Sequence, residues 1–205
     1  MNNDSTFECV LWDFGDTIAD QGWMLKSLPD VPNWSELFVE KVWNGAWGQS
    51  WFKGELSSIQ LSELLSELVD LEAGKIFEHM ELCSRDIVFF KNAFFAVKEL
   101  NFPQAIVTVN PDLFSSVVEE EYSLQSYFDT IVTSWEQKTL DKSVLCDKAM
   151  SMLGSTNRKK ALLIDNIEEN IKHWELMGGR GYHFQNDELF GYEMSSLLGI
   201  RASTM

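Results

Sequence analysis

The first hundred residues contain one short apolar run and then change to helical spacing. Residues 7–12 are almost wholly apolar and are followed by polar residues and a glycine, which predicts a short buried strand. Beyond about residue 20, apolar positions recur at intervals of three and four, the spacing of amphipathic helices. Sequences of the capping-box type precede two of these stripes, at 33–36 and 57–60. Further helices are expected over 71–80 and 84–100.

The second half of the chain alternates between short apolar runs and helical segments. Strands are predicted at 104–108, 130–133, 161–165 and 181–184. Helices are predicted between them at 111–121, 142–153 and 168–177. Because this alternation is typical of βαβ units, we expect an α/β fold with a Rossmann-like, three-layer α/β/α parallel sheet. Residues 1–20 and 85–205 would form the core domain, and residues 21–84 would form an inserted helical cap domain.

Composition and charge narrow the classes of function. A chain of 205 residues that is 45% hydrophobic can bury one sizeable core, or one core plus a small accessory unit. A net charge of −16 repels nucleic-acid phosphates and anionic membrane surfaces, so neither nucleic acid nor a membrane is expected as a partner. A phosphate-binding site in such a chain needs a local positive source, such as a metal ion, a lysine or a helix N-terminus.

The cysteines and the apolar runs favour a reduced, cytoplasmic protein. Cys9, Cys83 and Cys146 are odd in number and form no CxxC pair, so ordinary buried thiols are expected. Residues 1–6 are polar, so we expect no signal peptide, and no apolar run approaches the roughly 18 residues of a membrane span. The oligomeric state stays open, since the tryptophan-rich segment 43–51 suits either a core or an interface.

Polar residues lie at the carboxyl ends of three predicted strands, where open parallel sheets bind ligands. Asp13 follows the first strand, Thr108 ends the second and Asp165 ends the fourth. A carboxylate at the end of a buried strand is costly unless it is paired or binds a metal, and two converging carboxylates suit Mg²⁺. Either aspartate alone is more simply a helix cap. Together with Thr108 and a downstream lysine, they favour a catalytic site.

The order and spacing of these residues resemble the four motifs of haloacid dehalogenase-like (HAD-like) hydrolases. Residues 10–17 resemble the first motif, which is an apolar strand, a nucleophilic aspartate and a turn ending in threonine. Residues 105–108 resemble the second, and residues 163–170 resemble the acidic fourth. Lys142, with Lys138 as the alternative, resembles the lysine of the third. The inserted segment falls where the helical C1 cap of the family belongs.

The resemblance implies a Mg²⁺-dependent phosphatase that acts on a small phosphorylated metabolite. Asp13 would attack phosphorus and form an aspartyl-phosphate intermediate. Mg²⁺ would be held by Asp13, the backbone carbonyl of Gly15 and Asp165. The resemblance also implies Thr108 and Lys142 as catalytic groups. Asn110 and Asp16 are candidate substrate contacts, although both residue types also commonly form turns.

Gly15 departs from the family's pattern. Family phosphatases usually carry a second aspartate at this place, two residues after the nucleophile, as a general acid and base. General acid–base catalysis of this kind raises the reaction rate by about 10²–10⁴-fold. Asp16 is a possible substitute, although we favour a turn role for its side chain. Two functions therefore stay open: a slow or specialised phosphatase, and a catalytically impaired protein that uses the fold to bind a ligand or another protein.

Overall fold

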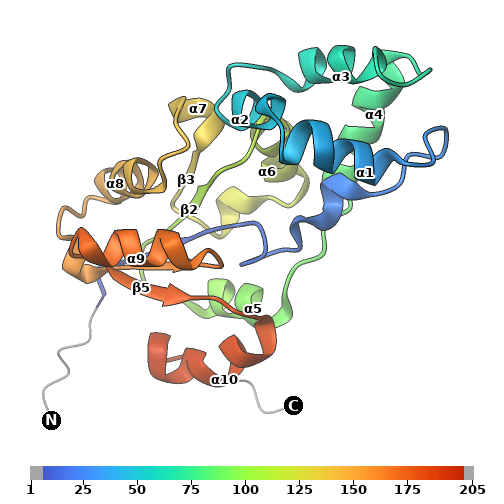
Figure 1. Ribbon diagram of the computed structural model, residues 1–205. Coiled ribbons are helices and arrows are strands. Elements are labelled where there is room, and N and C mark those ends of the chain that lie inside the picture. The colour runs from blue at the N-terminus through green and yellow to red at the C-terminus, as the bar shows by residue number, and fades with distance from the viewer. Residues whose placement is uncertain (1–6, 201–205) are drawn as a thin grey trace, which may run out of the picture.

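Five short strands form one wholly parallel sheet in the computed structural model, which describes residues 7–200 (Figure 1). The strands are β1 (Cys9–Trp12), β2 (Gln104–Thr108), β3 (Thr130–Thr133), β4 (Ala161–Asp165) and β5 (Arg180–His183), in the order β3-β2-β1-β4-β5. The predicted α/β fold is therefore confirmed. The first strand begins two residues later than predicted, and the expectation for residues 1–6 lies outside the described residues.

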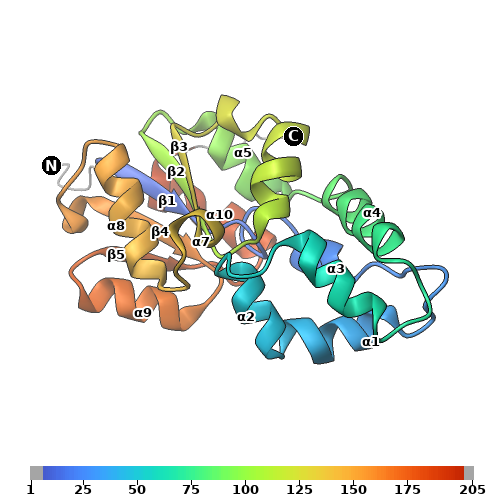
Figure 2. The same cartoon turned by 90° about the horizontal axis from the view of Figure 1, so that it is seen from above.

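Helices cover both faces of the sheet and make it the middle of three layers (Figures 1 and 2). On one face lie α8 (Lys142–Met152) and α9 (Glu168–Leu176). On the other lie α5 (Lys91–Glu99), α10 (Asp187–Leu198) and a helix made of the π-helical turn η3 (Phe114–Val118) and α6 (Glu119–Glu121). Because side chains alternate along a strand, Val10 and Trp12 pack on the second face, while Cys9 and Leu11 pack on the first.

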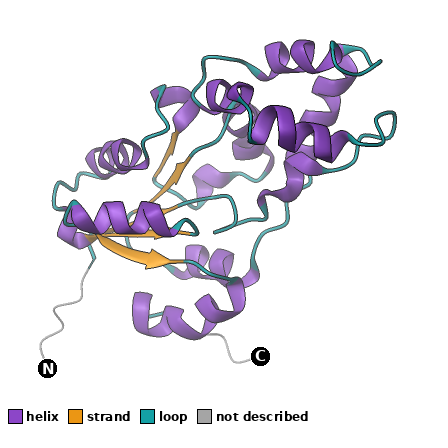
Figure 3. Ribbon diagram, in the orientation of Figure 1, coloured by secondary structure: helices purple, strands orange, loops and turns teal. Residues whose placement is uncertain are grey.

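The segment between β1 and β2 contains helices and loops but no strand (Figure 3). Before α5, its elements are the 3₁₀ helix η1 (Gln21–Leu25), α1 (Trp34–Phe38), the π-helical turn η2 (Val39–Trp43), α2 (Ala46–Phe52), α3 (Ser58–Ser66) and α4 (Ala73–Ser84). The capping box at 57–60 forms as predicted, since Ser57 and Gln60 exchange hydrogen bonds of 2.9 and 3.2 Å. The box predicted at 33–36 does not form, because the Asn33 side chain makes no capping bond.

The predicted helix over 84–100 is wrong in its first turns. Residues 85–90 are not helical, and α5 begins only at Lys91. The Val88 carbonyl accepts from the amide of Asp20, and the amide of Phe90 donates to the Ile18 carbonyl, both at 2.9 Å. These backbone groups bond to the chain leaving β1 and so cannot serve an α-helical ladder. These hydrogen bonds hold the segment that enters the inserted helices against the segment that leaves them.

Shorter helices and connections complete the core. These are the 3₁₀ helices η4 (Leu124–Ser126) and η5 (Arg158–Lys160) and the short α7 (Ser134–Gln137). The three cysteines are free and buried, and burial raises the pKa of Cys9 and Cys83 to about 11. Thiols in that range are protonated at neutral pH and poor nucleophiles. No helix within residues 7–200 combines the length and the apolar character needed to cross a membrane.

Candidate active site

The carboxyl ends of β1, β2 and β4 border a cavity of about 360 Å³. These three strands are neighbours, because β1 pairs with β2 on one side and with β4 on the other. The sheet side of the cavity is formed by Asp13, Gly15, Asp16, Thr108, Val109, Asn110, Lys142, Asn166, Ile167 and Asn170. Gln21, Trp43 and Phe52 reach it from the inserted segment. Six predicted site residues thus share one cavity, and Asp165 lies fully buried behind it.

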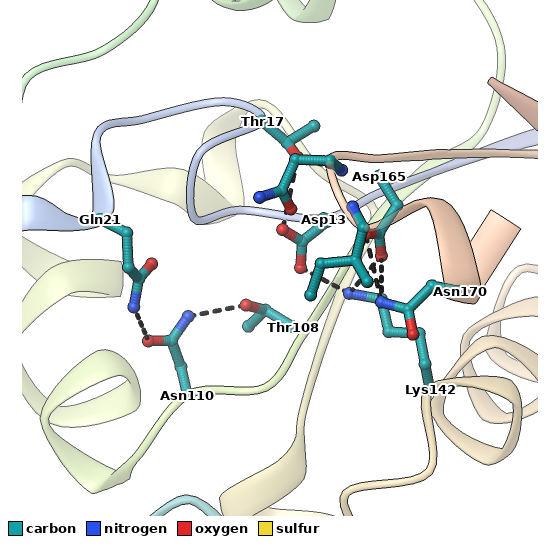
Figure 4. A network of polar contacts seen from close by, with 10 residues as sticks. Asp13, Thr17, Gln21, Thr108, Asn110, Lys142, Asp165 and Asn170 are labelled. Carbon is teal, nitrogen blue, oxygen red and sulfur yellow. Dashed lines mark hydrogen bonds and ion pairs between the residues drawn. The ribbon is translucent and has the colours of Figure 1, made fainter. Parts of the chain in front are cut away.

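A buried lysine joins the two predicted metal-binding carboxylates (Figure 4). The Nζ atom of Lys142 lies 2.5 Å from Oδ1 of Asp13 and 3.1 Å from Oδ2 of Asp165. Lys142 is the first residue of α8, and this helix start lies against the strand ends. Two carboxylates and one ammonium leave one net negative charge in a site that is almost closed to solvent. Groups of this kind shift each other's protonation strongly.

The protonation of this trio follows from burial and charge. Burial raises the pKa of Asp13 to about 6, with the negative charge of Asp165 adding to the rise and Lys142 opposing it. Burial alone would lower the pKa of Lys142, but the charges of Asp13 and Asp165 outweigh it and raise that pKa. Lys142 is therefore charged at neutral pH, and Asp13 is an available carboxylate only above about pH 6.

Two residues that the sequence analysis did not single out hold the aspartates in place. The hydroxyl of Thr17 donates to Oδ2 of Asp13 at 3.4 Å and accepts from the amide of Asn166 at 3.1 Å. The side-chain amide of Asn170 donates to both oxygens of Asp165, at 3.2 and 3.1 Å. Thr17 ends the first motif and Asn170 ends the fourth, so the sequence marked both positions without indicating these contacts.

A chain of hydrogen bonds links Thr108, Asn110 and Gln21 on another side of the cavity (Figure 4). Asn110 donates through Nδ2 to the hydroxyl oxygen of Thr108 at 2.7 Å, and its Oδ1 accepts from Nε2 of Gln21 at 3.4 Å. Because the Thr108 oxygen accepts from Asn110, its own O–H can be donated into the cavity. Asn110 is 1% exposed, so it makes these hydrogen bonds in the interior and does not face solvent.

Solved structures with the same arrangement of elements identify the fold. A predicted HAD-like family hydrolase from Porphyromonas gingivalis matches with a TM-score of 0.70 and 13% identity, over 96% of this chain and 100% of that one. A HAD family enzyme from Bacteroides thetaiotaomicron, in complex with magnesium and inorganic phosphate, matches with a TM-score of 0.66 and 14% identity, over 86% and 93%.

The chain has the HAD-like fold. An L-2-haloacid dehalogenase from Xanthobacter autotrophicus, with chloropropionic acid covalently bound, also matches, with a TM-score of 0.65 and 14% identity over 93% of this chain and 83% of that one. No family model matches the chain, and no curated protein matches it in sequence. At these identities the likeness establishes the fold and leaves the chemistry to be argued from this chain's own side chains.

The HAD-like fold raises the question whether these residues suit Mg²⁺. The oxygen donors at hand are the carboxylates of Asp13 and Asp165 and the carbonyl of Gly15, and they are of the type that Mg²⁺ prefers. The net negative charge of the trio also favours a cation. No group of three or more His, Cys, Asp or Glu side chains in residues 7–200 could hold a metal, so an ion here would need oxygens other than these side chains to complete its shell. The residues present fit the ion in chemistry.

The two candidate lysines occupy different places. Lys142 meets Asp13, as described above, whereas the Nζ atom of Lys138 donates to the Gly54 carbonyl at 2.8 Å and lies 4.1 Å from the centre of the Trp135 ring. Lys138 also has a φ of 56°, so it ends α7 rather than beginning a helix against the sheet. The geometry therefore associates Lys142, and not Lys138, with the candidate nucleophile.

Asp16 has the contacts of a turn residue. It is exposed, adopts a φ of 54°, and accepts the backbone amide of Gln21 through Oδ1 at 2.9 Å. Aspartate tolerates this left-handed conformation better than most residues do. Its carboxylate is thus engaged in shaping the chain that leads into η1, although Asp16 still borders the cavity.

Proposed function

We propose that the protein is a phosphatase that transfers the phosphoryl group of a small phosphorylated metabolite to Asp13 and then to water. The observation that carries this proposal is the buried pair of Asp13 and Lys142 at the carboxyl end of the central strand, open to a cavity. The Bacteroides enzyme of the same fold was solved in complex with magnesium and inorganic phosphate, which supports phosphoryl chemistry on this fold.

Each proposed role follows from a contact. An oxygen of Asp13 attacks phosphorus, and the bond to the leaving group breaks with its electron pair going to that group. The ammonium of Lys142 lies beside the attacking carboxylate and can offset the charge of the phosphoryl oxygens, and Thr108 donates its O–H to one of them. When bound by Asp13, the Gly15 carbonyl and Asp165, Mg²⁺ would supply further neutralisation of that charge.

We further propose that residues 21–84 are a cap domain over the core formed by 1–20 and 85–205. The inserted helices reach the core through specific contacts: Asp112 accepts from the amide of Ser58 and from the indole of Trp51, at 3.0 and 3.2 Å. The hydroxyl of Ser134 donates to the Phe52 carbonyl at 2.6 Å. These bonds hold α2 and α3 beside the cavity, so the cap would limit which leaving groups fit.

A catalytically impaired protein that binds a ligand or a partner is the second candidate function. The absence of a carboxylate at Gly15 favours it, because the acid that would protonate a leaving group is missing. Such a protein would keep the cavity and its affinity for phosphorylated molecules without turning them over.

Phosphate release from p-nitrophenyl phosphate and acetyl phosphate, with and without Mg²⁺, distinguishes the two functions. We expect Mg²⁺-dependent release by the wild type, none by Asp13→Asn, and unchanged release by the control Lys138→Met. If no phosphate compound is cleaved with any divalent metal, and Asp13→Asn behaves as the wild type does, the binding function replaces the hydrolase.

A further inference from the structure

The space beside Gly15 is filled by the side chain of Gln21. A Cβ atom built on Gly15 would lie 1.7 Å from Oε1 of Gln21 and 2.6 Å from its Cδ. Gly15 does not adopt a positive φ, so the backbone itself would accept another residue. The carboxamide of Gln21 thus occupies the position where a side chain at residue 15 would begin. The Gln21 side chain can take this position only because residue 15 is a glycine.

Gln21 is held in this position from three directions. Its backbone amide donates to Oδ1 of Asp16 at 2.9 Å, and its Nε2 donates to Oδ1 of Asn110 at 3.4 Å. It also begins η1, which Asp20 caps by accepting from the Gly22 amide at 2.7 Å. Nδ2 of Asn110 donates to Thr108, and Oδ1 of the same amide faces Nε2 of Gln21.

The amide oxygen of Gln21 is left without a partner. It is buried, and it is the one acceptor among the four buried, unpartnered side-chain polar atoms of residues 7–200; the others are indole nitrogens of Trp23, Trp34 and Trp174. A buried acceptor without a donor is costly. Gln21 lines the same cavity as Asp13, and a rotation of its carboxamide would bring this oxygen to a donor that enters the cavity. Water and a substrate hydroxyl are donors of this kind.

We propose that Gln21 is a positioning residue whose amide oxygen holds the water that attacks the aspartyl-phosphate at Asp13. The inference rests on the proposed function. The oxygen of this water forms a bond to phosphorus, while the bond from phosphorus to the Asp13 oxygen breaks and returns its electron pair to the carboxylate. A carboxamide accepts a hydrogen bond but not a proton. One water proton therefore passes to a phosphoryl oxygen of the departing phosphate, and dihydrogen phosphate leaves.

This arrangement predicts that the two half-reactions respond differently to Gln21. Formation of the aspartyl-phosphate needs no attacking water and should be unchanged in Gln21→Ala. Its decay should slow about tenfold, the loss expected for one hydrogen bond to the attacking water. Rapid mixing with acetyl phosphate, acid quenching and quantification of the phosphorylated protein give both rates. Gln49→Ala, an exposed glutamine of α2, is the matched control and should leave both rates unchanged.

Decay that is unchanged in Gln21→Ala, or formation and decay that slow equally, would overturn the role of Gln21 and leave the proposed function intact. The absence of any phosphorylated wild-type protein would instead count against the proposed function, and the role of Gln21 would fall with it.

A stability cycle tests the placement of Gln21 without substrate. The effects of Gly15→Asp and Gln21→Ala on the melting temperature should not be additive, and Gly15→Asp should be more favourable in the Gln21→Ala background, because the two side chains compete for one space. Strictly additive changes in melting temperature would contradict this placement.

Discussion

The sheet side of the cavity is lined mainly by charged and polar groups, whereas the helix side presents two aromatic rings. The sheet side offers Asp13, Lys142 and Thr108, each held by a buried hydrogen bond or ion pair. Besides Gln21, the helix side offers Trp43 and Phe52, whose rings meet edge to face at 5.9 Å, and within residues 7–200 it places no lysine or arginine on the cavity. We therefore expect the sheet side to bind a phosphoryl group, and the helix side to favour an uncharged, apolar leaving group over a sugar or a second phosphate.

The largest expected effect concerns the leaving group. With Gly15 and Gln21 in place of an acid, aryl phosphates should be cleaved far faster than alkyl phosphates, because a good leaving group departs without a proton. The alkyl substrates should suffer most of the roughly 10²–10⁴-fold cost of a missing general acid. The ratio of kcat/KM for phenyl phosphate and propyl phosphate measures this effect.

Restoring the acid should reduce the difference between aryl and alkyl substrates. Gly15→Asp combined with Gln21→Ala supplies both the carboxylate and the space for it, and should raise turnover of the alkyl substrate selectively. Equal kcat/KM values for aryl and alkyl phosphates in the wild type would show that another group supplies the proton, and Asp16→Asn would then test the neighbouring carboxylate.

The next effect concerns the charge balance of the sheet side. Lys142→Met leaves Asp13 and Asp165 buried without a cation and should destabilise the fold by about 3–5 kcal/mol at pH 7. Lys138→Met is the control: Lys138 is exposed, and its loss should cost less than about 1 kcal/mol. Urea denaturation followed by circular dichroism measures both. A difference near zero between the two variants would mean that Lys142 does not balance the buried carboxylates.

Much of the fold and of the sheet side follows from local sequence patterns. Apolar runs located all five strands, and the polar residue that ends each run located Asp13, Thr108 and Asp165. Parallel pairing then brought them together, because it aligns the carboxyl ends of neighbouring strands. The sequence left Lys142 and Lys138 as alternatives, and the left-handed φ of Lys138 separates them.

Features that depend on contacts between distant residues could not be predicted in this way. Residues 85–90 pair with the chain that leaves β1, so a helical pattern there was overridden by long-range backbone bonds. The contact between Gln21 and Asn110 joins residues 89 positions apart. The helix α10 was missed, although Asn186 caps its start and Gly199 ends it with a φ of 72°.

A smaller effect concerns the pH dependence of stability. Burial raises the pKa of Asp13 to about 6, whereas in the unfolded chain it is close to 3.9. The folded state thus binds this proton more tightly, and the stability that protonated Asp13 contributes is present below about pH 4 and lost as pH rises toward about 6. Relative to Asp13→Asn, the wild type should lose up to roughly 3 kcal/mol of unfolding free energy across this window. Parallel pH profiles for the two proteins would contradict the raised pKa.

The smallest effect concerns the helix side. Trp43→Ala or Phe52→Ala should raise KM for phenyl phosphate about tenfold with little change in kcat, because these rings bind the leaving group equally before and during the reaction. KM for acetyl phosphate should change less, since its leaving group is small. Leu68→Ala, an exposed apolar residue away from the cavity, is the control. A fall in kcat with unchanged KM would place the aromatic pair in the chemistry of the sheet side instead.

Phosphoryl transfer to Asp13 can be measured directly. The protein is mixed with acetyl phosphate and Mg²⁺, quenched in acid after milliseconds, digested, and its peptides are examined by mass spectrometry. We predict a phosphoryl adduct on the peptide that contains Asp13, released by hydroxylamine as an acyl phosphate is, and missing from Asp13→Asn. An adduct of equal yield in Asp13→Asn, or none in a wild type that releases phosphate, would contradict phosphoryl transfer to Asp13.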